Sequence, residues 1–252
     1  GGRLPAPNLK TLAGLTNYVE EHGCDIGIAT DGDADRLGVI DDKAEFLHPN
    51  KILVLLYYYL MRYRGWRGAA VRNLATTHLL DRIAEDFGET CYEVPVGFKY
   101  VSAKMVETGA IIGGESSGGL TVRGHIQGKD GIYAAALLVE AIAKTGRRLS
   151  ALWDEITQKY GVAEMAEHDF HFSSAERTRI FKLLMEDKQL PEFPCEIAKV
   201  SYMDGCKVYF KNGGWVIARF SGTEPLLRVF CEMDTMENAG KIAKILTEFL
   251  SL

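Results

Sequence analysis

The chain has 252 residues, a formal net charge of -5, a pI near 5.7, and hydrophobic residues at 47% of its positions. This length is enough for one large domain or for two smaller domains with cores of their own. The acidic balance and the absence of a Lys/Arg run argue against a nucleic-acid-binding surface. The longest apolar run, Ile52 to Met61, is too short to span a bilayer. Neither a nucleic acid nor a membrane is therefore expected among the partners.

The cysteines indicate the redox compartment. They are odd in number, widely spaced and without a Cys-x-x-Cys pair, which argues against a disulfide framework and against a zinc site. We therefore expect a cytoplasmic, reducing location.

The first two thirds of the chain alternate between helix and strand patterns. A helix is predicted after Asn8, which is placed to cap it. Further helices are predicted over 49–63, 77–87, 101–107 and 131–143, and strands over 25–30, 37–40, 69–75 and 110–112. This alternation predicts an α/β fold in which a mixed, mostly parallel sheet is covered by helices.

The pattern changes near Tyr160. Strands are predicted over 164–172, 196–202, 206–211, 214–219 and 227–232, with helices over 174–185 and 235–251. The dipeptides Asp204-Gly205 and Asn212-Gly213 mark tight hairpin turns. We expect a smaller α+β domain here, separated from the first within Lys159–Ala163.

An acidic loop follows the predicted strand 25–30. Asp31, Asp33 and Asp35 occupy alternate positions, and Gly32 permits a sharp turn. Carboxylates that converge in such a loop are suited to a hard cation such as Mg²⁺. A cluster of three anions repels itself, so a metal or the adjacent Arg36 has to neutralise it.

Two other interpretations of this loop have to be weighed. A calcium EF-hand fails, because Arg36 stands where that loop needs Gly and Asp42 where it needs Glu. A solvated acidic turn stays open as the simplest alternative.

A glycine-rich segment, 113–119, places Glu115, Ser116 and Ser117 between pairs of glycines. Glycines let the backbone turn and approach a ligand, and a carboxylate with hydroxyls is suited to sugar hydroxyls. Taken alone, an ordinary surface turn would look the same.

Near the C-terminus, 219–228 places Ser, Gly and Thr between two predicted strands. Backbone N–H groups and hydroxyls in such a loop suit a phosphate, and Arg219 and Arg228 add charge-assisted contacts. The alternative is a hairpin whose arginines face water.

Several of these motifs resemble one family. The segment 25–36, Asp-Ile-Gly-Ile-Ala-Thr-Asp-Gly-Asp-Ala-Asp-Arg, closely resembles the metal-binding segment of the α-D-phosphohexomutases. Gly97-Phe98-Lys99 resembles that family's active-site Gly-Phe-Lys. The segment 113–119 resembles its sugar-binding loop, 125–131 the segment after it, and 219–228 its phosphate-binding loop. The motifs also occur in the family's order.

The resemblance implies a role for each matching residue. Asp31, Asp33 and Asp35 are expected to hold Mg²⁺, and Arg36 and Lys99 to act in catalysis. Substrate binding is expected from Glu115, Ser117, His125, Lys129, Arg219, Ser221, Gly222, Thr223 and Arg228. Ser116 departs from the Glu or Met usual in the middle of the sugar loop, which leaves the sugar preference open.

The resemblance also implies an activity and a domain organisation. The activity is that of a phosphoglucomutase/phosphomannomutase, an intramolecular phosphotransferase that interconverts hexose 1-phosphate and 6-phosphate. It uses an enzyme phosphoserine and a bisphosphate such as glucose 1,6-bisphosphate. Residues 1–40 would be the end of domain 2, 41–160 domain 3, and 161–252 domain 4.

One part of the family pattern is missing. The phosphoserine segment Thr/Ala-Ser-His-Asn-Pro does not occur, and Gly1 begins the chain without a methionine. We therefore expect a C-terminal fragment, inactive alone, whose partners are a hexose phosphate and the missing N-terminal domains of the same protein. Two alternatives stay open: a non-catalytic sugar-phosphate-binding module and, more weakly, a sugar-phosphate phosphatase that uses the Asp cluster.

Overall fold

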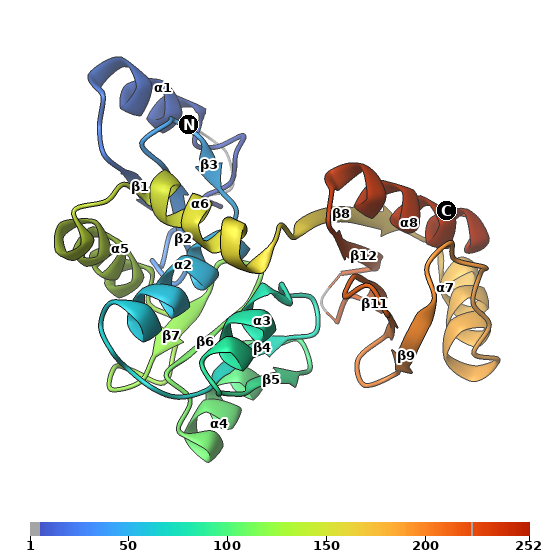
Figure 1. The fold of residues 1–252 in the computed structure, drawn as a ribbon. Helices are drawn as coiled ribbons and strands as arrows, with labels where there is room; N and C mark the ends of the chain where they lie inside the picture. The colour runs from blue at the N-terminus through green and yellow to red at the C-terminus, as the bar shows by residue number, and fades with distance from the viewer. Residues whose placement is uncertain (1–5, 223) are drawn as a thin grey trace. The chain divides into compact units, whose positions relative to one another are not determined.

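The computed structural model describes residues 6–222 and 224–252. The chain divides into two compact units, Gly1–Gly161 with two sheets and Val162–Leu252 with one, and each unit has its own helices (Figure 1). None of the helices in these residues combines the length with the apolar character that a bilayer crossing requires.

The first unit opens with helix α1 (Ala13–His22) and a small antiparallel sheet of order β1-β2-β3. The strands are β1 (Gly27–Thr30), β2 (Leu37–Ile40) and β3 (Phe46–Leu47). The prediction that Asn8 caps the helix is wrong. Its side chain accepts from the N–H groups of Lys10 and Thr11, at 3.0 and 3.1 Å, and closes a local turn instead.

A four-stranded mixed sheet of order β5-β4-β6-β7 forms the centre of this unit. Its strands are β4 (Ala70–Asn73), β5 (Cys91–Val94), β6 (Ile112–Gly114) and β7 (Leu120–Val122). β4 is parallel to both β5 and β6, and a helix connects β4 to β5 and another connects β5 to β6. A tight turn makes β7 antiparallel to β6. The predicted mixed sheet is confirmed.

The other helices of the first unit are α2 (Pro49–Arg62), α3 (Leu79–Asp86), α4 (Phe98–Thr108), α5 (Gly131–Thr145) and α6 (Leu149–Tyr160). α2 is buried along most of its length. Tyr58 of α2 donates to Glu155 of α6, and Tyr59 to Glu140 of α5, both at 2.6 Å. Burial raises the pKa of both phenols, so they stay protonated and keep donating these bonds.

The second unit is a five-stranded antiparallel sheet of order β8-β12-β11-β10-β9 with helices. The strands are β8 (Glu164–His171), β9 (Ile197–Ser201), β10 (Cys206–Phe210), β11 (Trp215–Phe220) and β12 (Leu226–Met233). Helix α7 (Ser174–Phe181) continues as the π-helix η1 (Lys182–Glu186), and α8 (Met236–Phe249) ends the unit. Both predicted hairpin turns are confirmed, with positive φ at Gly205 and Gly213.

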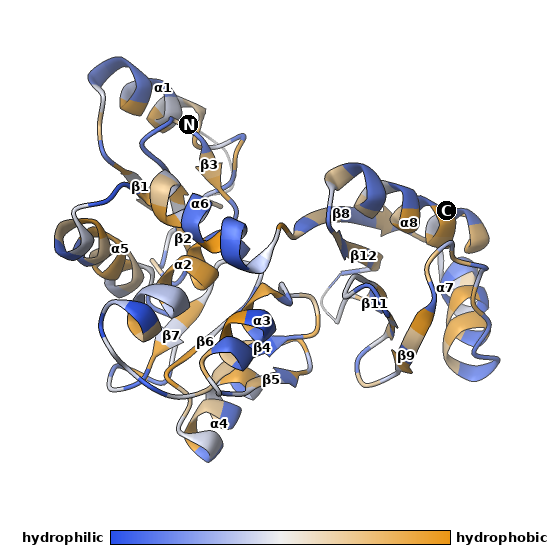
Figure 2. Ribbon diagram, viewed as in Figure 1, coloured by the Kyte–Doolittle hydropathy of each residue, from blue (hydrophilic) through white to orange (hydrophobic). Residues whose placement is uncertain are grey.

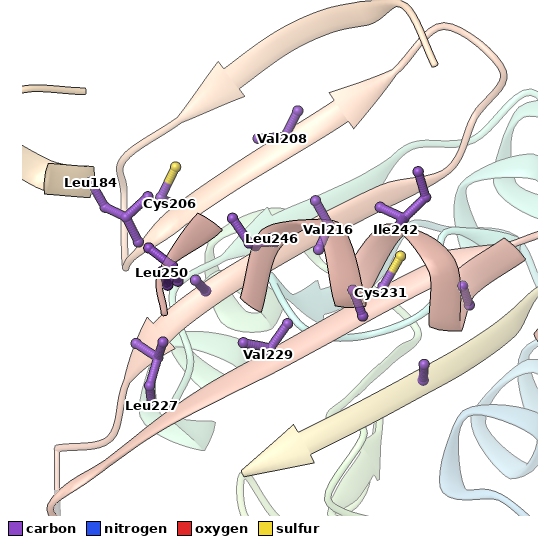
Figure 3. Packing of buried hydrophobic residues seen from close by; sticks show 14 of the residues in the cluster. Leu184, Cys206, Val208, Val216, Leu227, Val229, Cys231, Ile242, Leu246 and Leu250 are labelled. Carbon is purple, nitrogen blue, oxygen red and sulfur yellow. The ribbon is translucent and has the colours of Figure 1, made fainter. Parts of the chain in front are cut away.

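Helix α8 closes the core of the second unit. Hydrophilic and hydrophobic residues alternate along its turns (Figure 2). Its residues Ile242 and Leu246 lie against the strands near Val216 and Val229 (Figure 3). Removing this apolar face from water holds the helix on the sheet.

Candidate functional site

The acidic loop 31–36 connects β1 with its antiparallel neighbour β2, so it has to reverse the chain. Ala34 adopts a left-handed conformation with φ of 59°, and its N–H donates to the Asp31 carbonyl at 3.2 Å. This turn brings one carboxylate oxygen from each of Asp31, Asp33 and Asp35 within 4.8 Å of one another.

Two basic side chains partly neutralise the cluster of three carboxylates. Lys129 pairs with Asp35, and Nε of Arg36 lies 3.6 Å from a carboxylate oxygen of Asp31 and of Asp35. Burial acts to raise the pKa of Asp35. The hydrogen bond and charge of Lys129 outweigh it, with smaller help from Arg36, and hold that pKa below its ordinary value. Asp35 is therefore ionised at neutral pH.

The cluster fits a divalent cation. Asp35 Oδ1 is buried without a hydrogen bond in the described part of the chain, with Arg36 Nε 3.6 Å away, and a buried carboxylate oxygen in that state can still bind a cation. Asp33 is exposed and can reach such an ion from the solvent side. All donors are carboxylate oxygens, the ligand type of Mg²⁺ rather than of zinc.

The start of helix α5 packs directly on this loop. The Gly131 N–H donates to the Ala34 carbonyl at 2.9 Å. A Cβ at Gly131 would lie 2.8 Å from the Arg36 carbonyl oxygen, so only glycine fits there. Asp130 caps the helix by accepting from the Tyr133 N–H at 2.8 Å. The loop and the helix start therefore form one assembly.

His125 serves the same cap. Its Nε2 makes a hydrogen bond with Asp130 Oδ2 at 2.7 Å, and its ring stacks on Tyr133 with centroids 4.0 Å apart. His125 also lines a pocket of about 270 Å³ between α4 and residues 121–127. His125, a predicted substrate-binding residue, thus helps to hold the segment before α5.

The glycine-rich segment begins inside the sheet. Gly113 and Gly114 belong to β6, so the strand predicted to end at Ile112 extends further. A Cβ at Gly114 would lie 2.8 Å from the Leu53 side chain. These two glycines therefore serve close packing of the strand, and not a loop.

The turn itself covers 115–119. The Gly118 N–H donates to the Glu115 carbonyl and the Glu115 N–H to the Gly119 carbonyl, both at 3.0 Å. A Cβ at Gly118 would lie 3.7 Å from Cβ of Arg36, and one at Gly119 would collide with the Lys129 side chain. The turn therefore lies beside the acidic loop, as the proposed roles of the two segments require.

Glu115 links this turn with the Gly-Phe-Lys motif. It is 8% exposed, and its Oε1 accepts from Asn73 Nδ2 at 2.9 Å and from the Gly97 N–H at 3.0 Å. Gly97 precedes α4, and Lys99 in the first turn of that helix is exposed, with Nζ 4.9 Å from the ring centroid of Tyr100. The two motifs thus meet at one carboxylate oxygen.

The two serines of the turn differ. The Ser116 N–H donates to Thr76 Oγ1 at 3.0 Å, whereas Ser117 is exposed and free to meet a ligand. Sequence reasoning missed Asn73 and Thr76 as members of the site. Their position at the carboxyl end of a parallel strand was the available signal, because binding sites of α/β sheets gather there.

In the second unit, Arg219 of β11 and Arg228 of β12 are paired directly across the strands. Their side chains therefore start on the same face of the sheet. Arg219 Nε donates to Asp204 Oδ2 at 2.8 Å, and an Arg228 terminal nitrogen donates to Glu224 Oε2 at 3.1 Å. Each guanidinium already binds a carboxylate, by the same chemistry with which it would bind a phosphate.

Arg228 has a further donor. Its Nε is buried and makes no hydrogen bond within the described residues, with the Asp169 carboxylate 3.8 Å away. In the adjoining loop, the Ser221 N–H donates to the Leu226 carbonyl at 2.9 Å, and Gly222 has open space around it. Thr223, which is also predicted to bind the phosphate, lies outside the described residues.

Three protein-family models match the chain. Phosphoglucomutase/phosphomannomutase, alpha/beta/alpha domain II, matches residues 1–44, and alpha/beta/alpha domain III matches 48–160. The C-terminal domain of the same family matches 181–248.

Individual proteins agree with these matches. A phosphoglucomutase/phosphomannomutase of Thermococcus kodakarensis is 35% identical over 243 residues, covering 96% of this chain and 51% of the relative. A probable phosphoglucosamine mutase of Pyrococcus furiosus is 32% identical over 238 residues, covering 94% and 50%. A solved structure from Thermus thermophilus, assigned to the phosphomannomutases, has a TM-score of 0.79 and 29% identity, covering 98% and 51%. The chain thus spans about half the length of the relatives it matches.

Proposed function

This chain belongs to the α-D-phosphohexomutase family, and we propose that it carries the metal-, sugar- and phosphate-binding groups of a phosphohexomutase. The full reaction interconverts hexose 1-phosphate and hexose 6-phosphate. The observation that carries this proposal is the meeting of the acidic loop, Lys129 and the Glu115 turn within the first unit.

We assign residues 1–40 to the end of domain 2, 41–160 to domain 3 and 161–252 to domain 4 of that family. The ranges of the matching family models and the division of the chain after Gly161 support this assignment.

In the first unit, Asp31, Asp33 and Asp35 would hold Mg²⁺, which when bound neutralises phosphoryl charge. Arg36 and Lys99 add fixed positive charge for the same group. The charges act by stabilising and positioning the phosphoryl group, since phosphoryl transfer asks for little covalent chemistry from the protein.

The remaining groups bind the hexose phosphate. Glu115 accepts hydrogen bonds from sugar hydroxyls, and Ser117 can accept or donate them. His125 and Lys129 are further substrate-binding groups. In the second unit, the arginines and the loop between them bind a phosphate through charge-assisted hydrogen bonds: Arg219, Ser221, Gly222, Thr223 and Arg228. The relatives carry different names, phosphoglucomutase/phosphomannomutase and phosphoglucosamine mutase, so the particular hexose stays open.

The nucleophile is not in this sequence. No Ser-His-Asn-Pro segment occurs among the 252 residues, so a phosphoserine has to come from elsewhere. We expect these residues alone to bind a hexose bisphosphate without turnover, because positioned charges need a nucleophile to position. The same observation favours the second candidate function, a non-catalytic module that binds sugar phosphates.

Calorimetric titration with glucose 1,6-bisphosphate, with and without Mg²⁺, tests the proposal. We expect binding that tightens when Mg²⁺ is present; absence of binding in both conditions contradicts the assignment. To separate enzyme from module, Asp33→Asn is placed in a protein that also carries the phosphoserine segment. A large loss of mutase rate supports the enzyme, and an unchanged rate contradicts it.

A further inference from the structure

We propose that Asn73 is a positioning residue for the sugar. It fixes the Glu115 carboxylate in one orientation and couples the 115–119 turn to the start of α4. This inference rests on the proposed function, in which Glu115 is a sugar ligand, and it adds the residue that orients that ligand.

Asn73 uses all of its side chain for this purpose. It ends β4 and is 2% exposed. Nδ2 donates to Glu115 Oε1 at 2.9 Å, while Oδ1 accepts from the Ala75 N–H at 2.9 Å and from the Thr76 hydroxyl at 2.8 Å. A backbone N–H can only donate, so it determines which end of the amide faces Ala75 and which faces Glu115.

The contact with Asn73 gives the two oxygens of the Glu115 carboxylate different roles. Oε1 accepts both hydrogen bonds that the surrounding residues offer, from Asn73 and Gly97. No described residue donates a hydrogen bond to Oε2. Oε1 therefore belongs to the scaffold, and Oε2 is left to accept from a hydroxyl of the hexose.

Through Thr76, the Asn73 side chain also holds the backbone of the turn. The Thr76 hydroxyl that donates to Asn73 accepts from the Ser116 N–H at 3.0 Å. Asn73 thus reaches the turn twice, through the Glu115 side chain and through the Ser116 amide. The Gly97 N–H, bound to the same carboxylate oxygen, brings the start of α4 into the network.

The neighbouring Arg72 is not available for this task. Its guanidinium is committed to Asp81 at 2.7 Å and to Glu93 at 2.6 Å. Successive residues of a strand point to opposite faces, which separates this ion pair from the Asn73 network. A carboxylate introduced at position 73 would therefore stand directly against Glu115.

The test uses Asn73→Asp in this chain. Aspartate keeps the shape and the Oδ1 acceptor of asparagine but replaces the Nδ2–H donor with a second anion beside Glu115. Like charges at this distance repel and displace the carboxylate. We expect the amides of Gly97 and Ser116 to exchange their hydrogens at least about tenfold faster, as measured by NMR, given the strength of hydrogen bonds to charged acceptors.

Asn238→Asp is the matched control. Asn238, half-buried at the start of α8, also donates from Nδ2 to a carboxylate, that of Asp234, at 2.8 Å. This variant should leave the exchange of Gly97 and Ser116 unchanged. Unchanged exchange at Gly97 in Asn73→Asp would overturn the proposal.

A double variant, Asn73→Asp with Glu115→Gln, separates positioning from general damage. It restores an amide–carboxylate pair between positions 73 and 115 with the polarity reversed, so Ser116 should regain its protection. The Gly97 N–H then faces the amide NH2 in place of Oε1, so Gly97 should stay fast. Continued fast exchange at Ser116 would count against the pairing. If Asn73→Asp does not fold, Glu115→Gln alone decides. A neutral acceptor is weaker, so Gly97 should exchange several-fold faster, and an unchanged rate overturns the proposal.

Ligand binding then separates this inference from the proposed function. Asn73→Asp should weaken binding of glucose 1,6-bisphosphate and leave the affinity for inorganic phosphate unchanged. If the original chain does not bind the bisphosphate but the exchange results hold, the proposed function fails while the positioning of Glu115 by Asn73 stands.

Discussion

Lys129 and Asp35 form an ion pair that joins the segment before α5 to the acidic loop. The lysine therefore stands where part of the charge of a bound cation would act. The acidic cluster is partly neutralised by Lys129 and Arg36, and a divalent ion has to compete with them.

We predict that Lys129→Met tightens the binding of Mg²⁺ or Mn²⁺ about fivefold to tenfold, because it removes a positive charge beside the ligands. Titration calorimetry on this chain measures the change. Lys104→Met is the matched control, since Lys104 pairs with Glu107 within α4. Weaker binding in Lys129→Met would show instead that the lysine holds Asp35 in its ligating position.

We predict that Asp33→Asn abolishes the stabilisation of the protein by Mg²⁺. A ligand that binds only the folded state raises the melting temperature, so the original chain should melt higher with Mg²⁺. Asp33 is exposed, so the metal-free melting temperature should hardly change. Asp25→Asn, which alters an exposed carboxylate outside the loop, should retain the Mg²⁺ effect. A Mg²⁺-dependent shift that persists in Asp33→Asn would exclude it as a ligand.

We predict that Asp130 makes stability depend on pH in the acid range. Hydrogen bonds from the Tyr133 N–H and from His125 hold the pKa of Asp130 below its ordinary value. A carboxyl whose pKa is lower in the folded state adds stability above its ordinary pKa and loses it as the pH falls through the folded pKa. The unfolding free energy should therefore decline from about pH 5 downward.

The variant Asp130→Asn isolates this charge, because asparagine also caps helices well. Urea unfolding across a pH series should show a shallower acid decline than in the original chain. Identical pH dependence in the two proteins would mean that Asp130 is not the group responsible.

We predict that Arg228→Lys weakens phosphate binding to the second unit about tenfold although it preserves the charge. Lysine lacks the forked guanidinium and its buried Nε donor. Titration with inorganic phosphate measures the loss, with Lys211→Met, on the β10–β11 hairpin, as control. Equal affinity of Arg228→Lys and the original chain would remove Arg228 from the phosphate site.

We predict that Leu246→Ala destabilises the second unit by about 2–5 kcal/mol, because it opens a cavity under α8. Leu246 is 1% exposed and packs in the core between α8 and the sheet. Hydrogen exchange by mass spectrometry should show faster exchange across 162–252 and unchanged exchange in the strands of the first unit. Loss of protection in both units would show that they unfold together.

How far the sequence predicts this fold depends on how local each signal is. The acidic loop, α2, α5 and the hairpins of the second unit carry their own patterns, so these were predicted. The short strands β3, β5 and β7 were missed, because a few residues show no periodicity and only their neighbours in the sheet make them strands. Helix α6 was also missed, although Leu149, Leu152 and Ile156 carry the helical spacing.

The site shows the same division. The carboxylates of the acidic loop are close in sequence, and their convergence was predicted. The contact between Asn73 and Glu115 joins residues far apart in the chain, and no local pattern reports it. Lys129 was predicted to bind substrate, and its pairing with Asp35 was not foreseen.

The turn 115–119 is held at Ser116 by the backbone and not by the side chain. Every residue except proline supplies the same N–H to Thr76. The shape of the turn is therefore independent of the side chain at position 116, the position where this chain departs from the usual family motif. Evolution can therefore change the group offered to a ligand there without rebuilding the loop that offers it.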